Sequence, residues 1–180
     1  DPHYDFIMIP KVPLDTLDFT SYKMNLGSKM IIDATRKPER HVESRRKRES
    51  MTINIKSLDN RIVDLNLLED TFLLVKVSSG GHEIVEMLVK DPRLSNLSII
   101  AAVSEDVDIH DKESYIWGVF TRFDCERDVV FTEQKLAGIS PIYKGVMGID
   151  ATWKPGYPES LLMNEEIVKR VDEKWGSIWK

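Results

Sequence analysis

The feature that most limits the fold of this sequence is a regular alternation of apolar runs and amphipathic stretches. Phe72–Val77 and Leu97–Val103 are almost continuously apolar, which is typical of strands that are covered on both faces. Residues 81–90 and 112–123 carry apolar side chains at helical spacing, and Val129–Thr132 is a third apolar run. Strand, helix, strand, helix and strand in this order predict right-handed crossovers. We therefore expect an α/β fold, a three-layer sandwich on a small, mainly parallel sheet.

Composition is that of an ordinary globular protein. The 180 residues are enough for one domain with a sizeable core, and 42% of them are hydrophobic and 31% charged. The apolar runs fall far short of the roughly 20 residues that span a membrane, and no secretory signal pattern occurs. A net charge of -5 argues against nucleic-acid binding, and a single cysteine excludes an internal disulfide or a thiol-rich zinc site. We expect a cytoplasmic protein with neither nucleic acid nor membrane as a partner.

The sequence contains an internal repeat. Three pairs of segments match in the same order: 1–5 with 124–128, 6–9 with 129–131, and 30–38 with 147–155. The first copy is about 40 residues long, and a unit of that size buries too little surface to fold alone. We predict that residues 5–9 form a strand that completes a sheet, taken from residues 71–132 or from another subunit. Leu26–Thr35 is predicted to lie against a partner or a neighbouring domain. The alternative is that the first copy is a decayed duplicate without a role.

The chain divides into three parts: the partial repeat 1–38, a basic linker 39–50, and an α/β domain 51–180. Seven basic residues and three Glu crowd residues 36–50 with almost no apolar side chains, so this segment contributes no packed face. A patch that binds phosphate or acidic groups is the alternative. Alternation at Met51–Ile55 and the apolar residues of Arg61–Leu67 predict a hairpin at the start of the domain. Glu133–Pro158 lacks regular periodicity and is predicted to be a long loop.

Three motifs follow one another in the second half of the chain. They are Asp106-Val107-Asp108, then Thr121-Arg122-Phe123-Asp124 followed by Arg127-Asp128, and finally Ile149-Asp150-Ala151-Thr152. In this order they resemble the carboxy-terminal domain of the UbiD family, the prenylated-flavin-dependent decarboxylases and carboxylases of aromatic and unsaturated acids. The resemblance covers roughly residues 71–180 together with 1–38. Two positions depart from the family pattern: Ile31 stands where a glycine is usual, and Cys125 where proline is frequent.

The resemblance implies a scaffold rather than an active site. In the family, catalysis uses a prenylated flavin and a Glu-Arg-Glu set in the amino-terminal domain, and no part of this chain resembles that domain. We therefore assign no catalytic and no cofactor-binding residue, and expect prenylated FMN with a divalent metal and potassium in a partner catalytic subunit. The carboxy-terminal domain serves oligomerisation and lends a lid to the active site. The resulting interface or lid candidates are Leu26, Gly27, Ser28, Lys29, Met30, Asp33, Met147, Asp150, Trp175 and Trp179.

A few residues invite chemical interpretations of their own. Asp106, Asp108 and Asp111 form an acidic turn whose oxygen ligands would suit magnesium or calcium, although helix capping explains the same pattern. Cys125 is nucleophilic only if neighbouring arginines favour its thiolate; otherwise it is a passive turn residue. The turn Ser78–Gly81 is suited to holding a phosphate, but it lacks the spacing of known phosphate loops and fits a plain strand-to-helix turn. No histidine stands in a recognisable nucleophile motif.

The tail predicts an amphipathic helix from Asn164, with Glu165 and Glu166 in its first turn. Its apolar stripe consists of Ile167, Val171, Trp175, Ile178 and Trp179. Half-exposed tryptophans at the end of such a helix are strong interface anchors. Packing of the stripe on the chain's own sheet is the alternative.

These observations lead to one main functional hypothesis and two rivals. The main hypothesis is a non-catalytic subunit, for assembly or lid closure, of a UbiD-like aromatic carboxylase or decarboxylase comparable to multi-subunit anaerobic carboxylases. Its partners are UbiD-like catalytic subunits or further copies of itself. The first rival is a free-standing oligomeric binding module that reuses the fold, with a ligand at the carboxyl ends of the parallel strands. The second is a fragment of a complete UbiD-type decarboxylase, which a start on Asp1 without methionine also fits.

Overall fold

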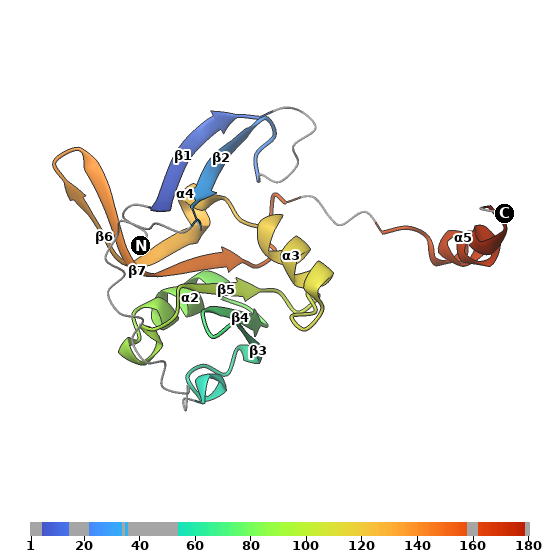
Figure 1. The fold of residues 1–180 in the computed structure, drawn as a ribbon, viewed down its shortest axis with the longest axis horizontal. Helices are drawn as coiled ribbons and strands as arrows, with labels where there is room; N and C mark the ends of the chain where they lie inside the picture. The colour runs from blue at the N-terminus through green and yellow to red at the C-terminus, as the bar shows by residue number, and fades with distance from the viewer. Residues whose placement is uncertain (1–4, 15–21, 34, 36–53, 158–161, 179–180) are drawn as a thin grey trace.

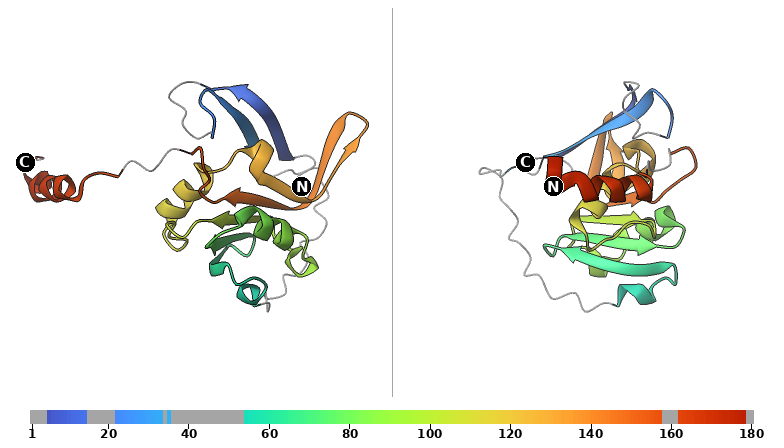
Figure 2. Two further views of the ribbon diagram at one scale, coloured as in Figure 1. Left: turned by 180° about the vertical axis from the view of Figure 1, so that it is seen from behind. Right: turned by 90° about the vertical axis from the view of Figure 1, so that its right-hand side faces the viewer.

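The structure is a computed structural model that describes residues 5–14, 22–33, 35, 54–157 and 162–178. Its centre is a mixed five-stranded sheet in the order β3-β4-β5-β7-β6 (Figure 1). A two-stranded sheet of β1 (Phe6–Pro13) and β2 (Leu26–Ile32) lies beside α4 (Cys125–Asp128) and the β6–β7 edge, and helices pack on the large sheet (Figure 2). The α/β sandwich that the sequence predicts is therefore confirmed.

The three central strands of the large sheet run parallel. β4 (Phe72–Val77) pairs with β5 (Ile99–Val103), and β5 pairs with the carboxyl half of β7 (Ser140–Ala151). Antiparallel strands close both edges: β3 (Ile62–Leu68) beside β4, and β6 (Val129–Ala137) beside β7. The apolar runs of β4 and β5 are buried as predicted, because both strands have a neighbour on each side and packed side chains on each face.

The third parallel strand is not the one that the sequence predicts. Val129–Thr132 lies in β6, which is antiparallel, and the third parallel strand is β7, inside the segment that was expected to be a loop. A tight turn at Gly138, where φ is 65°, folds β6 back onto β7. Glycines at 145 and 148 interrupt the apolar pattern of β7, which hides its strand character, although its last six residues are all buried.

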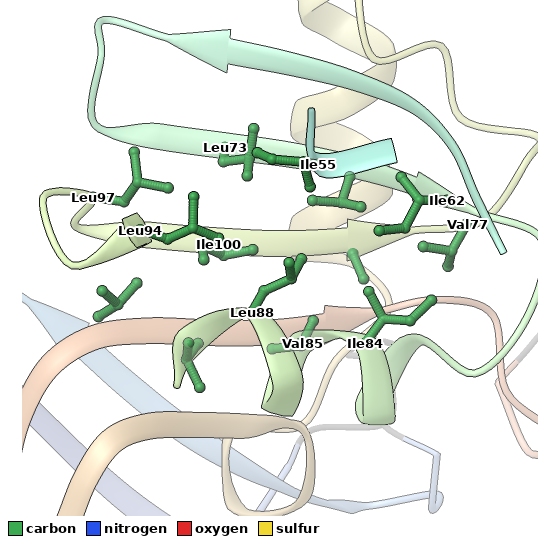
Figure 3. Packing of buried hydrophobic residues seen from close by; sticks show 14 residues of the cluster. Ile55, Ile62, Leu73, Val77, Ile84, Val85, Leu88, Leu94, Leu97 and Ile100 are labelled. Atoms are coloured by element: carbon green, nitrogen blue, oxygen red, sulfur yellow. The ribbon is translucent and has the colours of Figure 1, made fainter. Parts of the chain in front are cut away.

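Helix α2 (Gly81–Val89) covers one face of the sheet, close to the bounds that the sequence predicts. Two short 3-10 helices, η1 (Ile55–Ser57) and η2 (Pro92–Leu94), flank the same face. The side chains that meet there form a continuous core, drawn in Figure 3, that includes Ile55, Leu73, Val75, Val77, Ile84, Val85, Leu88, Leu94, Ile100 and Ala102. Alternate residues of β4 and β5 contribute to this core, so the remaining residues of both strands face the opposite layer.

The opposite face is covered by α3 (Lys112–Phe120), α4 (Cys125–Asp128) and the two-stranded sheet. A second apolar core lies between these elements and the large sheet. Its buried members are Phe6, Leu74, Ala101, Val103, Val107, Ile109, Val119, Phe131, Met147, Ile149 and Ala151. Core on both faces of the sheet makes the domain three-layered, as expected.

The predicted apolar stripe of α3 is only partly right. Val119 is fully buried, but about half of each of the Ile116 and Phe120 side chains is exposed. A Cβ atom on Gly118 would lie 2.6 Å from a methyl carbon of Val107, so the helix approaches its neighbours through the glycine. That close approach turns the helix away from the orientation that the spacing of its larger apolar residues suggests.

The hairpin predicted at the start of the domain is wrong in its first strand. Ile55–Ser57 forms η1, and β3 pairs with β4 instead. Ile55 is buried in the core beside α2, so its apolar character serves that core and not a strand alternation. Residues 51–53 and the predicted linker 39–50 lie outside the described residues.

Helix α5 (Glu165–Ile178) is the amphipathic helix predicted for the tail. The Glu166 amide donates to Asn164 Oδ1 at 2.9 Å, which is the predicted cap. No described residue of α5 is buried, and the helix stands apart from the sheet (Figures 1 and 2). Packing on the chain's own sheet is therefore not what the structure shows. Neither α5 nor any other helix in the described ranges is long and apolar enough to cross a membrane.

Candidate functional site

Two β-hairpins frame the candidate site. The first hairpin is β1 (Phe6–Pro13) with β2 (Leu26–Ile32), and the second hairpin is β6 with β7. Their registers correspond residue by residue: Phe6↔Ile32, Ile7↔Ile31 and Met8↔Met30 in the first, and Val129↔Ile149, Val130↔Gly148 and Phe131↔Met147 in the second. These are the residues that the internal repeat aligns. The repeat is therefore a structural duplication. The strand predicted at residues 5–9 is observed as part of β1, which begins at Phe6. Among the described residues β1 pairs only with β2, so it does not complete the sheet of residues 71–132, which was one of the two routes expected.

Both copies of the Asp-Ala-Thr motif make the same turn. In the second copy, the Thr152 amide and hydroxyl donate to Asp150 Oδ1 at 3.0 and 2.6 Å. In the first copy, the Thr35 amide and hydroxyl donate to Asp33 Oδ1 at 2.9 and 2.6 Å. A carboxylate that accepts from the backbone two residues further on is an Asx-turn, which ends a strand. Asp33 and Asp150 thus share one local function, the termination of β2 and β7.

A buried group of charges joins α4 to the segment that follows β7. Asp128 is 2% exposed, and its carboxylate accepts from Arg127 Nε at 2.8 Å and from Arg127 Nη2 at 2.9 Å. The same carboxylate accepts from the Asp124 amide at 2.8 Å and lies 3.3 Å from the Tyr157 hydroxyl. Arg127 also donates to Tyr157 at 3.0 Å. We call these residues, together with Asp150 and Lys154, the charged junction.

Lys154 ties β7 into the charged junction. Its ammonium donates to the Asp150 carbonyl oxygen at 2.7 Å and lies 3.3 Å from Asp150 Oδ2 and 3.6 Å from Asp128 Oδ2. Burial lowers the pKa of Lys154, while the two carboxylates act in the opposite direction. Burial is also the main cause of the raised pKa of Tyr157, so its phenol stays protonated as a hydrogen-bond donor. The buried side-chain polar atoms of the junction all have hydrogen-bond partners, which suits a structural role.

The first hairpin packs against α4 and the second hairpin. Ser28 Oγ donates to Asp124 Oδ1 at 2.9 Å, and Asp124 also caps α4 by accepting from the Glu126 amide. The ring of Phe6 meets the ring of Phe131 edge-on at 5.0 Å. The Arg127 guanidinium stacks on Tyr22, the residue that leads into β2, at 4.1 Å. The junction therefore fixes the first hairpin on its own chain.

The interface and lid candidates do not all lie at the surface. Met147 and Asp150 are buried in the domain, so neither side chain lies at its surface. Residues 26–30 belong to β2, where Gly27 is buried and Ser28 is bonded to α4, whereas Lys29 is exposed. Asp33 is exposed at the end of β2. Trp175 is 56% exposed on α5, and Trp179 lies outside the described residues.

The three acidic candidates for a metal have separate roles. Asp106 accepts from both terminal nitrogens of Arg122 at 2.9 and 2.7 Å, and this pairing lowers the pKa of Asp106. Asp108 accepts from the His110 amide at 2.9 Å. Asp111 caps α3 by accepting from the Ser114 amide at 2.8 Å. Helix capping, which the sequence left open as the alternative, is thus the observed role of Asp111.

Cys125 sits at the start of α4, where it is almost fully buried. Burial raises the pKa of its thiol to about 11, and the neighbouring Asp124 acts in the same direction.

We expect Cys125 to react with iodoacetamide at pH 8 at least about 100-fold more slowly than a free cysteine, because little thiolate is present. Mass spectrometry of the alkylation time course measures the rate, and the denatured chain is the control. A native rate within tenfold of the denatured rate would contradict the passive role.

Every buried side-chain nitrogen and oxygen among the described residues has a hydrogen-bond partner within the chain. In the same part of the chain, no group of three His, Cys, Asp or Glu side chains is arranged to hold a metal ion. We derive no catalytic step from this arrangement of residues.

A model of the family described as 3-octaprenyl-4-hydroxybenzoate carboxy-lyase C-terminal domain matches residues 1–34 and 81–151. The two matched stretches cover more than half of the chain, and each contains strands of one hairpin. The chain belongs to the UbiD carboxy-terminal domain family. The resemblance carried by the three sequence motifs is thereby confirmed, and so is its extension to the first copy of the repeat.

Relatives of this UbiD domain are much longer proteins. An uncharacterized protein of Archaeoglobus fulgidus is 35% identical over 145 residues, which are 69% of this chain and 30% of that protein. An uncharacterized protein of Chlamydia caviae is 24% identical over 176 residues, which are 97% of this chain and 29% of that protein. The chain thus spans about three tenths of the length of these relatives.

Solved structures of UbiD-class enzymes also match. The closed form of Sedimentibacter hydroxybenzoicus vanillic acid decarboxylase is 21% identical with a TM-score of 0.49, covering 70% of this chain and 30% of that chain. The enzyme HmfF from Pelotomaculum thermopropionicum, in complex with FMN, is 18% identical with a TM-score of 0.48, covering 64% of this chain and 29% of that chain.

Two residues of the charged junction, Lys154 and Tyr157, escaped sequence reasoning, and so did Tyr22, which stacks on Arg127. For Lys154 a signal existed, because a lysine follows the motif threonine by two positions in both copies of the repeat, as Lys37 and Lys154. The tyrosines carry no such signal, since they are brought to Arg127 only by the packing of distant segments.

Proposed function

We propose that this chain serves as the non-catalytic, assembling and lid-bearing part of a UbiD-class carboxylase or decarboxylase. The observation that carries the proposal is the family match, which falls on the carboxy-terminal domain and includes both hairpins. In this proposal the chemistry belongs to a UbiD-like catalytic unit outside these 180 residues. The pairing of the buried polar side chains with one another in the described part of the chain supports it. That unit would hold prenylated FMN, a divalent metal and potassium, and would act on an aromatic or unsaturated acid.

Helix α5 is the part of the chain best suited to assembly. Its apolar stripe is exposed along the whole helix and consists of Ile167, Val168, Val171, Trp175 and Ile178. A contiguous apolar stripe with a tryptophan near its end is typical of an interface anchor, because burying it on a partner removes a large apolar area from water. The partner is a UbiD-like catalytic unit or a further copy of this chain.

The length of the relatives favours a second form of the same function. The matched segments make up only 29% and 30% of the two relatives named above. The assembling part would then be one region of a longer UbiD-type decarboxylase, in place of a separate subunit. In both forms the flavin is held outside the 180 residues.

Affinity purification from the native host tests the proposal. A tag on the protein is expected to recover a species that carries prenylated flavin, seen by its absorbance, either in a co-eluting large subunit or in the same longer polypeptide. The 180-residue chain produced alone is expected to bind none. Stoichiometric prenylated flavin on the chain alone would contradict the proposal, and recovery of a flavin-free homo-oligomer would favour a binding module instead.

A further inference from the structure

The two hairpins share register and turn but differ in what covers them. Ile149 in β7 is 1% exposed, whereas its counterpart Ile32 in β2 is 43% exposed. On the other face of the first hairpin, Ile7 and Ile31 pair with each other and are 53% and 55% exposed. The first hairpin therefore presents apolar side chains to water at positions that are buried or partly buried in the second hairpin.

The coverage of the second hairpin comes from one helix and one strand. Helix α2 lies so close to β7 that a Cβ atom on Gly148 would be 2.3 Å from a methyl carbon of Val85. Val130, the cross-strand partner of Gly148, packs against the same core. Strand β5 pairs with β7 in parallel, and the Met147 amide donates to the Ser98 carbonyl oxygen at 3.0 Å.

The first hairpin has neither cover in the described part of the chain. The Asp33 amide donates to the Asp5 carbonyl oxygen at 2.7 Å, so this amide points toward the β1 side. Since amides alternate along a strand, those of Met30 and Ile32 point to the opposite edge of β2, as the Met147 amide points to β5. Within the described residues, β2 has only β1 as a neighbouring strand. An apolar strand edge of this kind is a template for a further strand.

We propose that β1 and β2 are the last two strands of a second domain of this same fold. In that domain a strand like β5 pairs in parallel with the free edge of β2, and a helix like α2 covers Ile7 and Ile31. The remaining strands and helices are supplied by another region of the same polypeptide in a longer protein. Two findings support a source of this kind: the family model matches both hairpin regions separately, and the relatives named above have room for a further domain.

A second copy of the described domain is not a suitable source for the missing strand. Its β5 already pairs with β4 on one side and β7 on the other, and the free edges of its sheet are β3 and β6. It would have to give up its own β7 before its β5 could pair with β2. The occupant must therefore be a strand–helix unit that has no terminal hairpin of its own.

The two domains are joined through equivalent faces. Phe6, Met8 and Met30, which share one face of the first hairpin, pack on the core that contains Phe131 and Met147. The repeat aligns Met8 with Phe131 and Met30 with Met147, so the same face of each hairpin lies in the contact. Such an arrangement resembles a two-fold interface between duplicated domains. Ile31 occupies the position that Gly148 has in the second hairpin, where the lack of a side chain lets Val85 of α2 come close. A helix that covers Ile31 must therefore present a smaller residue than Val85 or lie further from its strand.

Hydrogen exchange on the full-length protein tests this inference, which does not depend on the proposed function. The amides of Met30 and Ile32 are expected to be protected to within about tenfold of those of Met147 and Ile149, because both pairs donate to a parallel strand. Exchange of the β2 amides at a random-coil rate would overturn the inference. Protection that disappears when the protein is diluted to monomers would also overturn it, since the strand would then come from another molecule.

Two matched variants distinguish an effect on the pairing of the β2 edge from a general loss of stability. Ile31→Lys in the full-length protein is expected to lower the protection of the Met30 and Ile32 amides at least about tenfold, because a charge is then buried under the covering helix. Leu136→Lys, on an exposed position of β6, is the control and is expected to leave them unchanged. Equal effects of the two variants would show that the Ile31 face is uncovered and would overturn the inference.

Discussion

Replacing Asp128 with alanine is expected to lower the free energy of unfolding by about 3 to 5 kcal/mol, the usual effect of removing one partner of a buried ion pair. The Asp128 carboxylate is 2% exposed and accepts two hydrogen bonds from Arg127 and one from the Asp124 amide. Its loss leaves the Arg127 guanidinium and the nearby Lys154 ammonium short of a counter-charge. It also removes the acceptor of the Asp124 amide at the start of α4. Chemical denaturation followed by circular dichroism measures the change.

A matched control shows whether burial is the cause. Glu133→Ala removes the acidic partner of an ion pair with Lys135, but both side chains are exposed on β6. The expected loss is below about 1 kcal/mol, because exposed pairs contribute little. A loss for Asp128→Ala that is no larger than the control would mean that the charged junction does not hold α4 in place. The Asp128→Asn variant, which keeps an acceptor for the Asp124 amide but not the charge, is expected to lie between the two.

The elements that sequence predicted well are those whose pattern is local. β4, α2 and β5 are specified by apolar runs and helical spacing within short windows, and all three form close to their expected bounds. The Asn164 cap and the α5 stripe are local in the same sense. The repeat was equally visible, because matching segments need no knowledge of the fold, and the shared register of the hairpins confirms it.

The elements that sequence missed depend on contacts between distant residues. β7 is read as a loop because Gly148 breaks its apolar run, yet the glycine is needed there for the close approach of α2. The direction of β6 follows from its tight return at Gly138, which no periodicity reveals. The alternation around Ile55 suggested a strand. Ile55 lies instead in a 3-10 turn, and its side chain is buried in a core made by residues far away in the sequence.

In the candidate site, too, the sequence revealed the residues of local motifs but not their distant partners. The motif residues Arg127 and Asp128 were recognised, but their partners Tyr22 and Tyr157 come from segments far away in the sequence. Met147 and Asp150 were expected at an interface because they belong to a motif, and the structure buries them instead. A motif thus marks positions that matter without saying whether they face a partner or the core.

Deleting residues 164–180 is expected to abolish assembly while changing the melting temperature of the remaining domain by less than about 2 °C. No described residue of α5 is buried, so removing the helix is expected to change the stability of the domain by less than about 0.5 kcal/mol, which corresponds to a shift of this size. The association, by contrast, loses the exposed stripe that contains Val171, Trp175 and Ile178. Light scattering gives the mass of the assembly, and calorimetry gives the melting temperature of both forms.

Point variants locate the effect on one face of the helix. Trp175→Ala removes an aromatic side chain whose burial on a partner stabilises by about 2 to 3 kcal/mol, so the association is expected to weaken by roughly 30-fold or more. Glu173→Ala changes the polar face of the same helix and is expected to leave the mass unchanged. If Trp175→Ala lowers the melting temperature and leaves the mass unaltered, the stripe packs on its own chain. An isolated helix of 14 residues is marginal in water, so a partner surface that covers the stripe is expected to stabilise α5 itself.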